Sequence, residues 1–229
     1  MLSYDIKGET LPAVVCYPQK GQTIVCQKGA MSWMSPNMQM KTAVGTGGFS
    51  GLFGRMMTNE SAFLNKYIAT GDGALIAFAS QFPGSIIPFD ISPGNELIVQ
   101  KGGFLCAEEG VNLSMYFQKK LGGAFFGGEG FVMQKLSGNG TAFVEIDGSC
   151  VAYELEPGQE MIVDTGYLAA MSSTCTFDIT TVKGLKNIAL GGEGLFNIKV
   201  KGPGSIYIQT MPINKTAETL SMYMPYSNK

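Results

Sequence analysis

The sequence predicts an all-β protein that is built from three copies of one folding unit. A nine-residue pattern starts at Gly94, returns at Gly158 and has an earlier version at Gly21. Apolar and polar residues alternate within the copies, most clearly in the stretch FNIKVK at residues 196–201. Alternation with a period of two is typical of half-buried strands, and short strands between regular turns are typical of sandwiches and barrels. We therefore expect little helix, limited to single turns near residues 52–57 and 113–120.

The second and third copies align without a gap. An offset of 64 residues relates Glu96 to Glu160 and Lys135 to Lys199, together with many of the glycines. Self-similarity at a fixed period is the mark of a repeated architecture. The chain is thus a repeat protein at the level of its sequence.

We divide the chain into three repeats, at about residues 13–92, 93–156 and 157–211, with a C-terminal tail at 212–229. A unit of about 64 residues barely buries a core of its own. No linker separates the copies, so we expect one domain, residues 1–229, in which the units share a core with pseudo-threefold symmetry. The repeats leave sheet edges that a homo-oligomer would satisfy.

The first copy has the same landmarks at a different spacing. Gly21 lies 73 residues before Gly94, whereas Gly71, which we match to Gly128, lies only 57 residues before it. The difference places an insertion of 16 residues in the first copy, around residues 41–60.

This insertion supplies most of the candidate contact residues. It is rich in glycine and contains apolar side chains at Phe49, Leu52 and Phe53, and Arg55 is the only arginine of the chain. The Walker sequence of a phosphate loop is absent. Two interpretations stay open: the segment contacts a partner or a membrane surface, or it folds back and covers a sheet edge.

Trp33 is the single tryptophan of the chain and the fifth candidate contact residue. Tryptophan is a frequent anchor of protein interfaces. A lone tryptophan is also frequently a core residue. The sequence leaves both interpretations open.

A glycine-acidic-glycine motif occurs in each copy, at residues 71–73, 128–130 and 192–194. Glycine-rich turns can bind anions, and three carboxylates could ligate a metal if the copies brought them together. Glycine with a positive φ at a turn or bulge is the commoner use. We therefore assign these motifs to turns and predict no metal site.

Composition excludes several chemistries. The net charge of −2 provides no basic field that would attract nucleic acid. The chain has no histidine, which removes histidine-based acid–base catalysis, the usual hydrolase triads and histidine-ligated metals. We find no catalytic residue and no cofactor-binding motif, and we predict that the protein is not an enzyme.

The cysteines and the N-terminus bear on the compartment. The five cysteines include no C-x-x-C pair, and their odd number is typical of buried free thiols in a reducing compartment. The N-terminus lacks the pattern of a signal peptide, and no apolar run approaches the roughly 18 residues of a spanning helix. We expect a cytoplasmic protein.

Several stretches together resemble one widespread family. They are GLFGRMMTNESAF at residues 51–63, GDG at 71–73, PGSI at 83–86, and KGA and SWM within residues 28–34. The chain resembles, over about residues 13–211, the bacterial and archaeal relatives of the mitochondrial biogenesis factor "altered inheritance of mitochondria, number twenty-four".

The resemblance implies a double-stranded β-helix sandwich, similar to the tryptophan RNA-binding attenuation protein and triplicated in one chain. Mitochondrial members of the family are linked to inner-membrane organisation and to the assembly of respiratory complexes, without a known enzymatic step. This chain has no mitochondrial presequence, so that role does not transfer directly. A shared fold does not imply RNA binding.

We therefore favour a non-enzymatic scaffold or interaction protein, at a membrane surface or in a stress-related assembly. The alternative is a protein that binds a small ligand or a lipid in its interior or between its units. An RNA-binding module is the third hypothesis and the one that the composition supports least.

Overall fold

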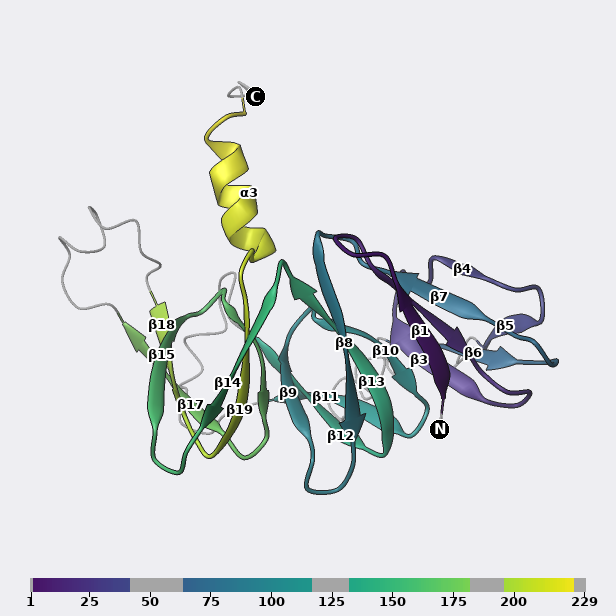
Figure 1. Ribbon diagram of the computed structural model, residues 1–229, viewed down its shortest axis with the longest axis horizontal. Helices are drawn as coiled ribbons and strands as arrows, with labels where there is room; N and C mark the ends of the chain where they lie inside the picture. The colour runs from purple at the N-terminus through teal and green to yellow at the C-terminus, as the bar shows by residue number, and fades with distance from the viewer. Residues whose placement is uncertain (1, 42–63, 117–131, 182–195, 225–229) are drawn as a thin grey trace, which may run out of the picture.

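A computed structural model of the chain describes residues 2–41, 64–116, 132–181 and 196–224. In these residues 19 strands form four sheets, and the one helix, α3 (Ile213–Ser221), follows the last strand. Figure 1 shows the sheets arranged in a row, with α3 projecting from it. The prediction of an all-β protein with little helix is confirmed.

Strand pairing divides the described strands into three units of six strands each, preceded by β1 (Ser3–Lys7). The first unit contains β2 (Ala13–Tyr17), β3 (Thr23–Gln27), β4 (Trp33–Met34), β5 (Met38–Lys41), β6 (Leu64–Ala69) and β7 (Ile76–Ala79). The second contains β8 (Gly84–Ile91), β9 (Leu97–Gln100), β10 (Phe104–Glu108), β11 (Val111–Tyr116), β12 (Met133–Gly138) and β13 (Gly140–Asp147). The third contains β14 (Cys150–Leu155), β15 (Glu160–Asp164), β16 (Leu168–Ser172), β17 (Thr176–Thr181), β18 (Phe196–Lys201) and β19 (Gly204–Gln209).

Each unit is a sandwich of two three-stranded halves. In the second unit one half has the order β8-β13-β10 and the other has the order β11-β12-β9. The first unit repeats this plan with β2-β7-β4 and β5-β6-β3, and the third with β14-β19-β16 and β17-β18-β15. The pairs between named strands are antiparallel, as short turns between neighbouring strands require.

Neighbouring units are joined because a half of one unit continues into a half of the next. β3 pairs with β10, and β9 pairs with β16, so that two six-stranded sheets form. In order along the molecule, the first sheet is β1-β2-β7-β4, the second is β5-β6-β3-β10-β13-β8, the third is β11-β12-β9-β16-β19-β14 and the fourth is β15-β18-β17.

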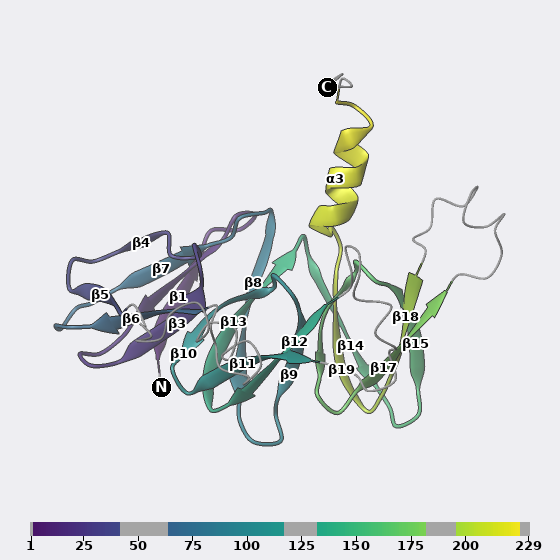
Figure 2. The ribbon, with the colours of Figure 1, turned by 180° about the vertical axis from the view of Figure 1, so that it is seen from behind.

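The first and fourth sheets lie at opposite ends of the molecule in both views (Figures 1 and 2). The sheets do not close into a barrel. The units therefore follow one another in a row and not around the threefold axis that we expected.

The core consists of three apolar layers, one between each pair of successive sheets. Their largest members include Phe78 between the first and second sheets, Phe104 between the second and third, and Phe177 between the third and fourth. Because side chains alternate between the faces of a strand, one strand serves two layers. Cys106 of β10 packs in the first layer, and its neighbour Ala107 packs in the second. Adjacent units thus share residues at each junction.

The observed strand pairing places the boundaries between units at different residues from those we predicted. We placed the stretches that form β8 and β14 at the ends of the first and second repeats. In the structure these strands pair with β13 and β19, the last strands of the following units. The units therefore begin near residues 13, 84 and 150.

The register also corrects the size of the insertion in the first unit. Met38 lies opposite Ala69 in the pair β5–β6, and Val111 lies opposite Gly138 in the equivalent pair β11–β12. The first pair of residues is 31 positions apart in the chain and the second is 27 positions apart. The connection in the first unit is thus longer by four residues and not by 16, and every unit has a long connection at this place.

Three local predictions are wrong. Gly71 follows the end of β6 as Gly140 follows the end of β12, so its match to Gly128 does not hold. The helical turn predicted at 113–120 begins inside a strand, β11, and the turn predicted at 52–57 lies outside the described residues. Helix was expected only at these two places, but the tail contains α3.

Candidate interaction surfaces

Only one of the five candidate contact residues lies in the part of the chain that the structure describes. Phe49, Leu52, Phe53 and Arg55 fall outside the described residues. Trp33 lies on β4, which ends the first sheet.

The backbone around Trp33 is held firmly on one side. Trp33 lies opposite Ala77 of β7, and on either side of it Ser32 N–H donates to the Ala77 carbonyl (2.9 Å) and Ser35 N–H to the Leu75 carbonyl (3.0 Å). The Ser32 hydroxyl also accepts the N–H of Ala79 (2.9 Å). The other side of β4 has no strand beside it among the described residues. β4 is therefore a fixed strand with an open edge.

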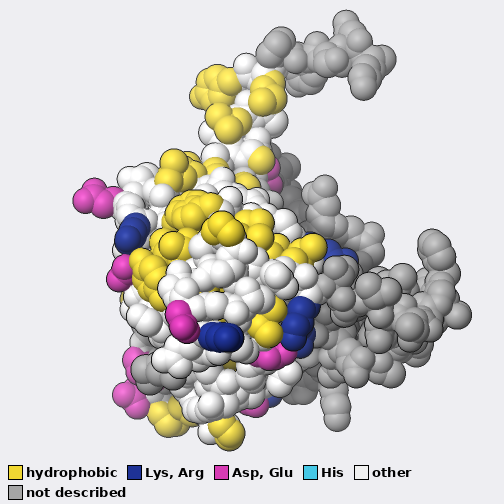
Figure 3. Space-filling model, turned by 90° about the vertical axis from the view of Figure 1, so that its right-hand side faces the viewer, with side chains coloured by type: hydrophobic (Ala, Val, Ile, Leu, Met, Phe, Trp, Pro, Cys, Tyr) yellow, Lys and Arg dark blue, Asp and Glu magenta, His cyan; other side chains and the backbone are white. Residues whose placement is uncertain are grey.

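The side chain of Trp33 is 48% exposed. The interpretation of Trp33 as a core residue is therefore wrong, and its role as an interface anchor stays a prediction. Met34 and Met40 are exposed to 38% and 50% at the same end of the molecule. We call Trp33 and Met34 of β4 the first-unit edge. Figure 3 shows this end of the molecule, where hydrophobic side chains gather among polar ones.

The other end of the row also has an open strand. β15 ends the fourth sheet and pairs only with β18 among the described strands. Ile162, in the middle of β15, is 67% exposed, whereas the next residue, Val163, is buried. Glu160 at the start of β15 forms an ion pair with Lys199 of β18 (3.3 Å). We call Ile162 and its neighbours on β15 the third-unit edge.

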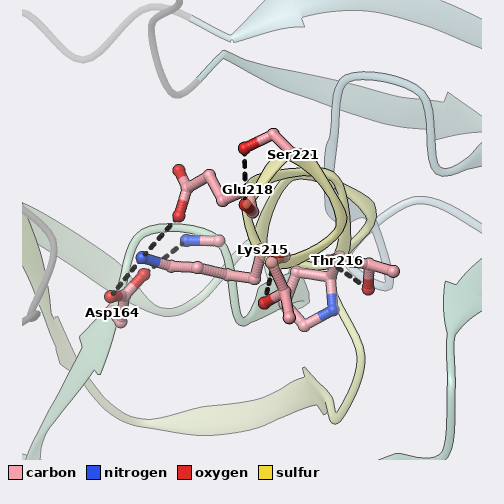
Figure 4. Close-up of polar contacts among 8 residues, drawn as sticks. Asp164, Lys215, Thr216, Glu218 and Ser221 are labelled. Atoms are coloured by element: carbon pink, nitrogen blue, oxygen red, sulfur yellow. Dashed lines mark hydrogen bonds and ion pairs between the residues drawn. The ribbon is translucent and has the colours of Figure 1, made fainter. Parts of the chain in front are cut away.

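Helix α3 is attached to the third unit by polar contacts (Figure 4). Lys215 forms an ion pair with Asp164 of β15 (3.6 Å) and one with Glu218 on its own helix (3.7 Å). At the start of the helix, Ile213 N–H donates to Asp147 Oδ2 (2.8 Å). The helix has no buried residue, and Leu220 is 54% exposed. The apolar side chains of the helix therefore face solvent, and the contacts named above that attach it to the sheets are polar.

Asp147 links α3 to the second unit. Burial raises the pKa of Asp147, and the hydrogen bond from the Ile213 backbone partly offsets that rise. Its backbone N–H donates to the side chain of Gln209 (3.2 Å), which in turn donates to Gln100 Oε1 (3.0 Å) and the Gly166 carbonyl (2.7 Å). The buried amide of Gln209 is thus satisfied, and this network is structural.

The thiols are poorly suited to chemistry. All five cysteines are free, and four are buried, as predicted, while Cys150 is half-buried. Burial raises the pKa of Cys26 to about 12. Burial also raises the pKa of Cys106 well above its usual value, and its contacts with Cys16 raise it further. Because the thiolate is the nucleophile, a raised pKa makes these side chains poor nucleophiles at neutral pH.

A hollow of about 630 Å³ lies where the first and second units meet. Its lining includes Thr23, Asp90, Glu108 and Thr141. Glu108 Oε2 accepts the backbone N–H of Thr141 (2.8 Å), and Asp90 Oδ1 accepts its hydroxyl (3.3 Å). The carboxylates thus already have partners, and no group of three or more potential metal ligands occurs within the described ranges.

The third-unit edge was missed by the sequence analysis. Its signal is in the repeat: Ile162 aligns with Ile98, and residues 212–229 do not continue the repeat. Within the described ranges no helix is long and apolar enough to cross a membrane.

Comparisons with known proteins support the relationship that the motifs indicated. The model of the mitochondrial biogenesis AIM24 family matches residues 4–211. An uncharacterised protein of Streptococcus pyogenes serotype M6 is 31% identical over 225 residues, which cover 95% of this chain and 88% of that protein. A crystal structure of a Streptococcus pyogenes protein superposes with a TM-score of 0.81 at 26% identity, covering 98% of this chain and 100% of the other.

Proposed function

The chain belongs to the mitochondrial biogenesis AIM24 family, and on that premise we propose that it is a non-enzymatic interaction protein that binds a polypeptide partner at the first-unit edge. The observation that carries the proposal is the 48% exposure of Trp33 on an open strand.

The physical case rests on the cost of leaving this edge open. An edge strand presents unpaired backbone groups, and proteins usually protect such edges with charges, proline or a covering segment. Here Trp33 and Met34 are the only residues of β4, and neither is charged. Aromatic residues on a fixed backbone lose little conformational entropy on binding and are enriched among the residues that dominate interface energies. The edge is thus suited to accept another strand.

The chemistry of the chain supports a binding role over a catalytic one. The sequence has no histidine, and burial raises the pKa of Cys26 to about 12. A nucleophile needs a lowered pKa or an adjacent base. Neither is provided for the buried thiols.

The proposal is tested by photo-crosslinking in the native host. A photoreactive phenylalanine analogue replaces Trp33 in one version of the protein and Tyr153 in a matched control. Tyr153 is 47% exposed, which matches Trp33, but lies on a different sheet edge. We expect a discrete crosslinked polypeptide from position 33 and none, or far less, from position 153. Equal labelling at both positions would refute a specific contact at the first-unit edge.

The second candidate function is binding of a small polar ligand in the hollow between the first and second units. Its position between units favours this, because ligand sites often lie at such junctions. Its lining by Asp90 and Glu108 does not suit an apolar lipid tail. A thermal-shift screen of metabolites against the wild type and Glu108→Gln would reveal stabilisation that the variant loses. No stabilisation across a broad screen would count against this function.

A further inference from the structure

We infer that copies of this chain join head to tail, with β15 of one copy pairing with β4 of the next, in the same way that successive units join inside the chain. The inference rests on the proposed function and names its partner as a second copy of this chain. Two observations support it. The two internal junctions show the geometry of strand pairing between units, and the strands β4 and β15 at the two ends of the row lack such a partner among the described strands.

The internal junctions follow one rule. The second strand of a unit pairs antiparallel with the third strand of the next unit. At the first junction Val25 lies opposite Ala107, and at the second junction Ile98 lies opposite Met171. These residues occupy the same positions of the repeat, since the offset of 64 relates Ala107 to Met171 and both Val25 and Ile98 lie opposite a lysine on the fifth strand.

The two open edges are the unused halves of this junction. β15 is the second strand of the third unit, and among the described strands it pairs only with β18. β4 is the third strand of the first unit, and in the described part of the chain it pairs only with β7. Ile162 lies opposite Lys199 of the fifth strand, which fixes it as the equivalent of Val25 and Ile98. The pair β4–β7 likewise matches Trp33 to Cys106 and Met34 to Ala107.

Burial shows what the missing neighbour does at the third-unit edge. Val25 is 3% exposed and packs in the layer between the second and third sheets, which belongs to the second unit. Ile98 is fully buried in the layer of the third unit. Each side chain is therefore buried by the unit that follows its own. Ile162 occupies the same position on a strand that has only β18 beside it among the described strands, and it is 67% exposed.

The first-unit edge shows the reciprocal pattern. Cys106 and Ala170, the equivalents of Trp33, are fully buried, and each packs in the layer of the preceding unit. Trp33 is 48% exposed, and within the described ranges no strand pairs with the outer edge of β4. Its larger side chain offers more apolar surface to a neighbour than the cysteine or alanine of the internal junctions. The two exposed edges are thus complementary to each other and not to themselves.

The internal register specifies the contact. Val163 of one copy lies opposite Trp33 of the next copy, and Ile162 lies opposite Met34. The fourth sheet then continues into the first sheet of the next copy, as the second and third sheets already combine two units. Because the two edges differ, the interface is heterologous, and repetition gives a closed ring or an open filament and not an isolated twofold dimer.

The experiment is sedimentation velocity on the purified full-length chain over a range of concentrations, with variants that block one edge each. Ile162→Lys blocks the third-unit edge, and Trp33→Lys blocks the first-unit edge; both side chains are at least 48% exposed, so the fold tolerates the changes. Tyr153→Lys changes a similarly exposed residue on another edge and serves as the control. Circular dichroism confirms that each variant is folded.

We expect species larger than the 24.4 kDa chain for the wild type and for Tyr153→Lys, and single chains for each blocked variant. A mixture of the two blocked variants has one intact edge on each partner. It should form a dimer and nothing larger, which is the signature of head-to-tail contact. In that dimer the single tryptophan, supplied by Ile162→Lys, is shielded, so its emission shifts to shorter wavelength on mixing.

Monomeric wild type at every concentration would overturn the inference. So would assembly that survives Ile162→Lys, or a mixture of blocked variants that stays monomeric. The proposed function can be distinguished from this inference. If the chain stays monomeric but position 33 crosslinks to another polypeptide, the inference fails and the proposed function stands. If the chain stays monomeric and position 33 crosslinks to nothing, both fail.

Discussion

Ile98 and Ile162 occupy equivalent positions in the second and third units. Replacing each by alanine tests directly whether Ile98 is buried at a junction and Ile162 lies on an open edge. Ile98 is fully buried between β16 and β12, whereas Ile162 is 67% exposed. Removing a buried isoleucine to alanine costs about 2–5 kcal/mol. Full burial of such a side chain is worth about 1.5–3 kcal/mol, so the shielded third of Ile162 accounts for about 0.5–1 kcal/mol.

We therefore expect Ile98→Ala to lower the free energy of unfolding by at least about 1 kcal/mol more than Ile162→Ala. With a denaturant slope of about 2 kcal/mol/M, the difference moves the urea midpoint by at least about 0.5 M. Circular dichroism reads the midpoint, and both substitutions are made together with Trp33→Lys, so that single chains are compared. Equal losses for the two variants would refute the assignment of Ile162 to an open edge.

Three further predictions concern other parts of the chain. Burial raises the pKa of Asp147, so this carboxyl contributes stability that is present below its ordinary pKa and lost as pH rises through the raised pKa. As the pH rises through that acidic window, the urea midpoint of the wild type should therefore fall relative to the midpoint of Asp147→Asn. A difference between the two midpoints that is constant with pH would contradict this prediction. Iodoacetamide at neutral pH should label half-buried Cys150 before Cys26, whose pKa is about 12, as peptide mass spectrometry would show; faster labelling of Cys26 would mean that the first layer opens readily. If the segment at 41–60 contacts membranes, replacing its three apolar contact residues, 49, 52 and 53, with serine should abolish liposome flotation with the fold intact, and unchanged flotation would exclude that role.

The strands could be predicted from the sequence because their signal is local. Alternation in residues 196–201 and the offset that relates Lys135 to Lys199 are properties of the chain alone, and β18 lies where they indicate. The order of the strands in the sheets has no such signal. β3 of the first unit pairs with β10 of the second, and the residues of these strands do not indicate which strand they pair with. The row of four sheets therefore could not be derived from the pattern.

One of the wrong predictions came from using a glycine motif to align the repeats. Gly71 was matched to Gly128 because both begin a glycine-acidic-glycine motif, but glycines mark turns in many places. The register of β5 with β6 shows that the match was displaced. Helix α3 was missed because it lies outside the repeat and has no polar residue at its N-cap, which is Pro212. The helical turn expected from residue 113 gave way to β11, whose pairing with β12 over six residues overrides local preference.

The exposure of Trp33 could not be read from its residue type, since tryptophan is common both in cores and at interfaces. It follows from position in the repeat. Cys106 and Ala170 are buried by the unit before them, whereas β4, which carries Trp33, has only β7 beside it among the described strands. Any residue whose equivalents are buried by a neighbouring unit is a candidate contact residue in the terminal copy that lacks that neighbour.

The ends of the row differ from those of repeat proteins that function as single chains. Such proteins close their arrays with terminal units that present a polar outer face. This chain adds a strand, β1, beside β2, and four of its five residues are exposed. Within the described residues no strand pairs with the outer edge of β4 or of β15, where Trp33 and Ile162 are exposed. In that part of the chain one edge of the first sheet is thus capped, while the two edges that correspond to internal junctions are apolar and unpaired, which is the arrangement that continuation of the row into another copy requires.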